Sequence, residues 1–171
     1  MRNLFYFFFV VLLSTNVYAN TNKNTISWEK YIEKKTKNIT IPTMEPLYLK
    51  QLIDGTLVQN YILLDIREPN EINNENTIPK IDKVTIPRGL LEFKIKKYNK
   101  DLYNKKIIIL CTSGLRSKLA YITLMEMGYN DILILTGGMK KWEKDCLPTL
   151  SVEPNNSLFD NIKKPKIGCG E

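Results

Sequence analysis

The segment that most constrains the fold of this chain is CTSGLRS, at residues 111–117. It directly follows an apolar run at residues 107–110, which predicts a short buried strand. The stretch after it, residues 118–127, has one broad apolar face and predicts a helix that ends before Gly128. Strand, tight loop and helix in this order are typical of an open α/β sheet, which binds ligands at the carboxyl ends of its strands. The sequence therefore predicts an α/β fold with Cys111 at the ligand-binding edge of the sheet.

The residues of this loop suit a thiolate and an anionic ligand better than they suit a protein core. Cys111 would lie at the amino end of a helix, where backbone N–H groups favour negative charge and a thiolate becomes a ready nucleophile. Arg116 adds a permanent, planar positive charge that can bind an oxyanion. The alternative is a buried structural cysteine, but a glycine, an arginine and several hydroxyl groups are poor core material. We therefore expect Cys111 and Arg116 to be catalytic residues.

The chain contains no histidine, and this absence limits its chemistry. Ser–His and Cys–His catalysis within the chain are excluded, as are metals bound by histidine. The three cysteines, at positions 111, 146 and 169, lack the spacing of a zinc site. We expect no metal and no cofactor, so a catalytic cysteine must be activated by electrostatics alone. The net charge of +7 suits anionic ligands, but the basic residues are spread along the chain and do not indicate nucleic-acid binding.

Residues 1–19 have the features of a secretory signal peptide. Arg2 supplies a positive charge, residues 4–13 form an apolar run too short to span a bilayer, and Val17-Tyr18-Ala19 forms a suitable cleavage site. We expect cleavage after the alanine, so that the mature chain begins at Asn20 and has no stable membrane span. The alternative is an uncleaved N-terminal anchor. The mature protein is expected in the periplasm or outside the cell, where conditions are oxidising.

Two further cysteines lie toward the carboxyl end of the sequence. Cys146 follows a predicted helix, at a position where glycine would suit the helix end, and Cys169 is flanked by glycines in a tail predicted at residues 151–171. In an oxidising compartment we expect these two cysteines to pair, or Cys169 to accept sulfur from Cys111. The alternative for Cys146 is a half-buried residue without a chemical role.

The rest of the chain alternates between short apolar runs and amphipathic segments. Strands are predicted at residues 61–65, 84–87, 107–110 and 131–135. Helices are predicted at residues 26–37, 44–53, 90–98, 118–127 and 137–142. Thr43 is the expected N-cap of the second of these helices. Strands that alternate with helices indicate a parallel sheet covered on both faces.

Several motifs occur together in an order and spacing that resemble a known protein family. They are Leu64-Asp65-Ile66-Arg67-Glu68-Pro69 with Glu71, then Ile86-Pro87-Arg88-Gly89-Leu90-Leu91-Glu92-Phe93, the Cys111 loop, Gly128-Tyr129, Gly137-Gly138 and Trp142. Together they resemble a single-domain rhodanese, a sulfurtransferase, from about Met44 to Pro148. The resemblance implies a three-layer α/β fold, with a five-stranded parallel sheet and helices on both faces. The expected organisation is a signal peptide at residues 1–19, an N-terminal extension at 20–42, a rhodanese domain at 43–150 and a flexible tail at 151–171.

The resemblance also implies chemical roles for the loop and its neighbours. Cys111 would take a sulfane sulfur from a small anionic donor, thiosulfate or a persulfide, and pass it from its own persulfide to a thiol or cyanide acceptor or to a partner protein. Arg116 would orient the anionic oxygens of the donor. The residues that would bind substrate, most of them through backbone N–H groups, are Thr112, Ser113, Gly114, Leu115 and, at the site entrance, Arg88. The residues expected beside the site in structural roles are Asp65, Arg67, Glu71 and Ser117.

Other functions remain open at this point. Phosphatases that share the rhodanese fold have one more residue in the loop, whereas four residues separate Cys111 from Arg116, the sulfurtransferase length. A module that only binds a partner would typically lack the cysteine, and a thiol redox or sulfur-relay protein is a further alternative. The family's frequent Gly-His-Ile motif is replaced here by Glu75-Asn76-Thr77-Ile78-Pro79. That histidine is not the base for the nucleophile in the family, so its loss need not abolish activity.

Overall fold

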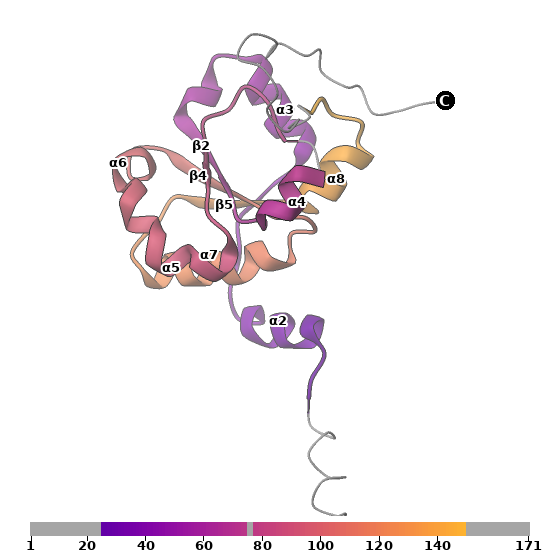
Figure 1. Ribbon diagram of the computed structural model, residues 1–171, viewed down its shortest axis with the longest axis vertical. Helices are drawn as coiled ribbons and strands as arrows, with labels where there is room; N and C mark the ends of the chain where they lie inside the picture. The colour runs from indigo at the N-terminus through magenta and orange to yellow at the C-terminus, as the bar shows by residue number, and fades with distance from the viewer. Residues whose placement is uncertain (1–24, 75–76, 150–171) are drawn as a thin grey trace, which may run out of the picture. The chain divides into compact units, whose positions relative to one another are not determined.

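The computed structural model describes residues 25–74 and 77–149, coloured in Figure 1. The predicted signal peptide, the predicted tail and Cys169 lie outside these residues. The chain divides into two units after Lys34, and each is described by itself. Near this boundary, helix α2 (Trp28–Thr36) confirms the helix predicted over residues 26–37, and within it the rings of Trp28 and Tyr31 stack with their centroids 6.1 Å apart.

A parallel sheet forms the centre of the second unit. Its strands among the described residues are β1 (Thr43–Met44), β2 (Tyr61–Asp65), β3 (Lys83–Thr85), β4 (Lys106–Leu110) and β5 (Ile132–Leu135). They lie in the order β1-β5-β4-β2-β3, and every neighbouring pair is parallel. The predicted five-stranded parallel sheet is therefore confirmed, with the strand that leads to Cys111 at its centre.

Helices cover both faces of the sheet, as Figure 1 shows for α5 and α7 on one side and α3 and α8 on the other. The helical segments of this unit are α3 (Pro46–Asp54), η1 (Leu57–Asn60), α4 (Pro69–Asn74), η2 (Arg88–Leu90), α5 (Leu91–Lys94), η3 (Ile95–Tyr98), α6 (Asn99–Leu102), α7 (Leu115–Glu126) and α8 (Gly138–Lys144). Successive side chains of a strand point to opposite faces. In β4 Ile107 and Ile109 therefore pack toward α7, while Ile108 and Leu110 pack toward α3 and α8. No described helix is long and apolar enough to cross a membrane.

One expectation about local structure was wrong. Thr43 is not a helix N-cap: Thr43 and Met44 form β1, paired with Ile134 and Leu135 of β5, and α3 begins at Pro46 with Glu45 as its N-cap. The prediction failed because this strand forms through hydrogen bonds to residues far away in the sequence, and local propensity does not reveal such a pairing.

The helix predicted over residues 90–98 is confirmed only in part. The segment is helical but divided: the single turn of α5 lies between the 3-10 turns η2 and η3, and the backbone at Leu90 is not helical. These breaks still bury Leu91 and Ile95 in the core that contains α7. Packing onto the sheet has therefore overridden the regular helical pattern.

The carboxyl ends of β2 and β4 bring two of the sequence motifs together. Asp65, the last residue of β2, pairs with Leu110, the last residue of β4, and the N–H of Ile66 donates to the carbonyl of Leu110 over 2.9 Å. The chain after β2 and the chain after β4 therefore leave the sheet side by side. This register places the segment that contains Glu71 next to the Cys111 loop.

Candidate active site

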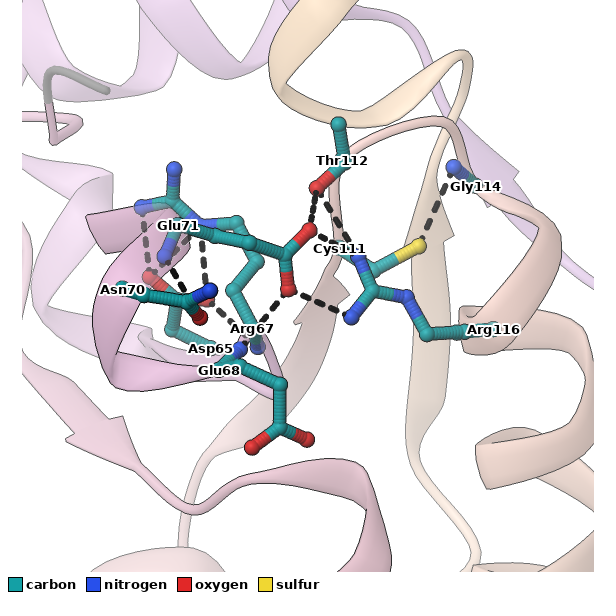
Figure 2. A network of polar contacts seen from close by, with 9 residues as sticks. All are labelled: Asp65, Arg67, Glu68, Asn70, Glu71, Cys111, Thr112, Gly114 and Arg116. Carbon is teal, nitrogen blue, oxygen red and sulfur yellow. Dashed lines mark hydrogen bonds and ion pairs between the residues drawn. The ribbon is translucent and has the colours of Figure 1, made fainter. Parts of the chain in front are cut away.

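Cys111 is the first residue after β4 and is completely buried. Its sulfur accepts a hydrogen bond from the backbone N–H of Gly114 over 3.1 Å, as Figure 2 shows. Gly114 adopts a left-handed conformation, with φ at 84°, and is the N-cap of α7. Glycine adopts this conformation without the steric penalty that other residues incur. The loop thus turns back on the cysteine, with one amide directed at its sulfur and the amino end of a twelve-residue helix beside it.

Helix α8 holds the Cys111 loop in place through the backbone. The N–H of Met139 donates to the carbonyl of Cys111 and the N–H of Lys140 to that of Thr112, both over 2.9 Å. Gly138 lies so close to the Cys111 loop that a Cβ built on it would be 2.2 Å from the carbonyl oxygen of Cys111. The first amides of α8, which have no partner inside the helix, are thereby satisfied by the loop. From the sequence, Gly137-Gly138 was interpreted only as a turn and a family motif. The pair of glycines was the sequence feature that could have indicated this close contact.

Arg116 forms a forked ion pair with Glu71, across 45 residues of sequence. The two terminal nitrogens of its guanidinium donate to the two carboxylate oxygens over 2.6 and 2.5 Å. The hydroxyl of Thr112 donates to Glu71 over 2.6 Å and accepts from Arg116 over 2.9 Å, which closes the network drawn in Figure 2. The sequence predicted a structural role for Glu71, whereas the structure places it in direct contact with the expected catalytic arginine.

This network fixes the charge of its members. The hydrogen bonds from the Arg116 guanidinium do most to lower the pKa of Glu71 to about 2, although burial of the carboxyl acts in the opposite direction. The Thr112 hydroxyl and the N–H of Glu68 also contribute to this lowering. The hydrogen bonds to Glu71 in turn raise the pKa of Arg116. The stabilisation from a depressed carboxyl pKa is complete above the unfolded value, near 4.5, and is lost as the pH falls toward 2. Glu71 therefore remains ionised at any pH near neutral.

Asp65 and Arg67 form a second ion pair beneath the segment that carries Glu71. Both side chains are fully buried, and the guanidinium contacts the carboxylate with a closest distance of 2.8 Å. The N–H of Arg67 also donates to Asp65, over 3.1 Å. Removal of one partner from such a pair typically costs about 3–5 kcal/mol of stability. The pair shapes the turn from β2 into α4, and so the position from which Glu71 reaches Arg116.

The other predicted site residues have different surroundings. The Arg88 guanidinium donates to Glu92 over 2.8 Å and to Thr123 over 2.9 Å, so its described contacts lie between α5 and α7 and not at the Cys111 loop. Its role in substrate binding stays a prediction. Ser117 is buried, and its hydroxyl donates to the carbonyl of Ile109 over 3.5 Å, a bond that joins α7 to β4. Of the loop residues, Ser113 is exposed and Leu115 is half-buried.

The two described cysteines differ in state and in surroundings. Cys111 is a free thiol, whereas Cys146 is exposed and disulfide-bonded. Cys146 has a φ of 58°, which confirms that it occupies a position suited to glycine. Its predicted pairing with Cys169 concerns a residue outside the described ones and stays a prediction. Within residues 25–74 and 77–149, no three His, Cys, Asp or Glu side chains group as a metal site would require.

Known proteins resemble this chain in both sequence and structure. Residues 45–145 match the family model of the rhodanese-like domain. A sulfurtransferase from Allochromatium vinosum is 35% identical over 95 residues, which are 56% of this chain and 83% of the relative. The structure of a protein of unknown function from Rhodopseudomonas palustris, described as a possible tyrosine phosphatase, is 26% identical with a TM-score of 0.62, over 75% of this chain and 97% of that one. A rhodanese-related protein from Thermoplasma volcanium is also 26% identical, with a TM-score of 0.54, over 65% and 99% of the two chains.

Proposed function

Because this chain belongs to the rhodanese family, we propose that it is a sulfurtransferase in which Cys111 carries the transferred sulfur as a persulfide. The observation that carries the proposal is the free, buried thiol of Cys111, with the N–H of Gly114 only 3.1 Å from its sulfur. Amide donors and a helix amino end favour an anionic sulfur at this position without a base. This fits a chain that contains no histidine.

The proposed reaction has two displacement steps at sulfur. The thiolate of Cys111 attacks the sulfane sulfur of the donor and forms a new S–S bond. The bond between that sulfur and the rest of the donor breaks, and its electron pair leaves with the donor remnant, as sulfite from thiosulfate or as a thiolate from a persulfide. An acceptor thiolate or cyanide then attacks the outer sulfur of the Cys111 persulfide, and the Cys111 thiolate is regenerated. The N–H of Gly114 and the amino end of α7 stabilise the negative sulfur before and after each step.

Mass spectrometry of the intact protein tests this proposal. Incubation with thiosulfate or with a thiol persulfide should add about 32 Da, one sulfur atom, and peptide mapping should locate it at Cys111. Cyanide should then remove the added mass and yield thiocyanate. A chelator present throughout should change nothing. If no donor adds sulfur to Cys111, the proposal is wrong.

Phosphate-ester hydrolysis is the second candidate, suggested by the description of the Rhodopseudomonas relative. Two features of the chain favour sulfur transfer over it. Only four residues separate Cys111 from Arg116, and the Arg116 fork is filled by the carboxylate of Glu71, which would repel a phosphate dianion. Brisk hydrolysis of an aryl phosphate by the wild-type protein would favour the phosphatase function instead.

The proposal includes export from the cytoplasm, on the basis of Arg2, the apolar run at residues 4–13 and Val17-Tyr18-Ala19. The mature protein is expected to begin at Asn20. Expression of the full chain in a bacterium, followed by fractionation and N-terminal sequencing, measures this directly. Recovery of the uncleaved chain from the cytoplasmic fraction would contradict it.

A further inference from the structure

The anion-binding edge of Arg116 is already occupied by a group of the protein itself. Both terminal nitrogens of the guanidinium donate to the Glu71 carboxylate, and one of them also donates to the Thr112 hydroxyl. This fork is the part of an arginine that binds an oxyanion with two parallel hydrogen bonds. A donor whose oxygens are to bind Arg116 through this fork must therefore compete with Glu71 for the same atoms.

The two arginines nearest to the Cys111 loop in the described network are each neutralised by a carboxylate. The positive charge of Arg116 is balanced by Glu71, and the buried charge of Arg67 is balanced by Asp65. These two ion pairs therefore offer no net positive charge to an incoming dianion. The side chains of Arg116 and Glu71 are only 26% and 24% exposed, so water screens this interaction less than it would on an open surface.

Glu71 is also held firmly in this place. Its carboxylate accepts from the N–H of Glu68 over 2.9 Å and from the Thr112 hydroxyl, in addition to the two bonds from Arg116. Protonation does not release it near neutral pH, since its pKa is about 2. A dianionic donor would have to break these contacts and leave a partly buried carboxylate with fewer partners.

On the basis of the proposed function, we propose that Glu71 determines donor specificity: it disfavours a dianionic donor such as thiosulfate and favours a persulfide whose sulfane sulfur is attached to an uncharged organic group. Such a donor has no anionic oxygens beside its sulfur, so it does not need to bind the fork of Arg116. In the reaction, the Cys111 thiolate bonds to the outer sulfur of the protonated persulfide, and the donor S–S bond breaks to release an organic thiolate. No oxidant or reductant is required, because one S–S bond replaces another.

The experiment compares kcat/KM for two donors, thiosulfate and 2-hydroxyethyl persulfide, at fixed ionic strength and neutral pH. In Glu71→Gln, the kcat/KM for thiosulfate relative to that for the persulfide should rise by at least about tenfold, mainly through a lower KM for thiosulfate. Glu68→Gln is the matched control. It removes the same charge from the same segment, but the Glu68 side chain is exposed and acts on Arg116 through its charge alone, with no described hydrogen bond between the two side chains. The ratio in this control should stay within about twofold of the wild type.

Each outcome decides the matter. An equal loss with both donors in Glu71→Gln would mean that Glu71 merely positions Arg116, and an unchanged ratio would mean that it does not select donors. Either result overturns the inference. The wild type gives a measurement that does not depend on folding of the variant: a kcat/KM for thiosulfate above that for the persulfide would also overturn it. Failure of the proposed function is distinct, since the wild type would then take sulfur from neither donor and gain no mass at Cys111.

Discussion

Replacing Cys111 by serine should lower sulfur transfer from any donor by at least about a thousandfold, to the background of the assay. In the proposed reaction the sulfane sulfur binds to the buried sulfur that follows β4, and the Gly114 N–H stabilises this sulfur as an anion. A serine hydroxyl is not ionised by one amide and a helix amino end near neutral pH, and it cannot hold a persulfide. The measurement is thiocyanate production with cyanide as the acceptor, together with the mass of the intact protein.

Cys146→Ser is the matched control for this prediction. It also removes a sulfur atom, but Cys146 is exposed, disulfide-bonded and placed after the end of α8. The variant should still gain sulfur on Cys111. Transfer by Cys111→Ser at the wild-type rate would show that another thiol carries the sulfur, and the proposed role of Cys111 would be lost.

Replacing Gly138 by alanine should distort the Cys111 loop and destabilise the fold by about 2–5 kcal/mol. Two effects act together. The φ of Gly138 is 60°, which strains any other L-residue, and the new Cβ would be 2.2 Å from the carbonyl oxygen of Cys111 and 2.9 Å from the nitrogen of Gly114. These neighbours are backbone atoms that cannot rotate away. Since a displacement of about 1 Å can cost about a hundredfold in rate, transfer should fall by about that factor in the folded fraction.

Two other glycines separate the contributions to this effect. Gly128 has a φ of 91° with no atom near its added Cβ, so Gly128→Ala carries the backbone strain alone, about 1–2 kcal/mol. Gly89 has neither the strain nor a neighbour within 4 Å, so Gly89→Ala should change stability by less than about 1 kcal/mol. Urea unfolding and transfer rates of the three variants measure both quantities. If Gly138→Ala is no worse than Gly128→Ala, α8 does not hold the loop as described.

Local sequence patterns predicted the parts of the fold that depend on neighbours in the chain. Strand β2 was predicted with the bounds that the structure gives, and strands β4 and β5 to within one residue, because short apolar runs bounded by polar residues suit a buried parallel sheet. The placement of Cys111 between a strand and a helix also follows from local pattern. Strand β1 was missed because a strand of two residues is too short to show an alternation of apolar and polar side chains, and its partners in the sheet lie 91 residues away.

The local sequence was enough to predict the proposed reactive group and its setting: a cysteine at the end of a strand, a glycine that lets the loop turn, and an arginine at the start of the following helix, α7. The contacts of these residues become visible only in the folded chain. The register of β2 against β4 brings Glu71 to Arg116, and the packing of α8 brings its amides to the carbonyls of Cys111 and Thr112. Turn and helix preferences arise from steric and hydrogen-bond effects within a few residues, so they can be predicted from local sequence. Contacts across the sheet depend on register and packing of the whole chain, which one sequence does not specify residue by residue.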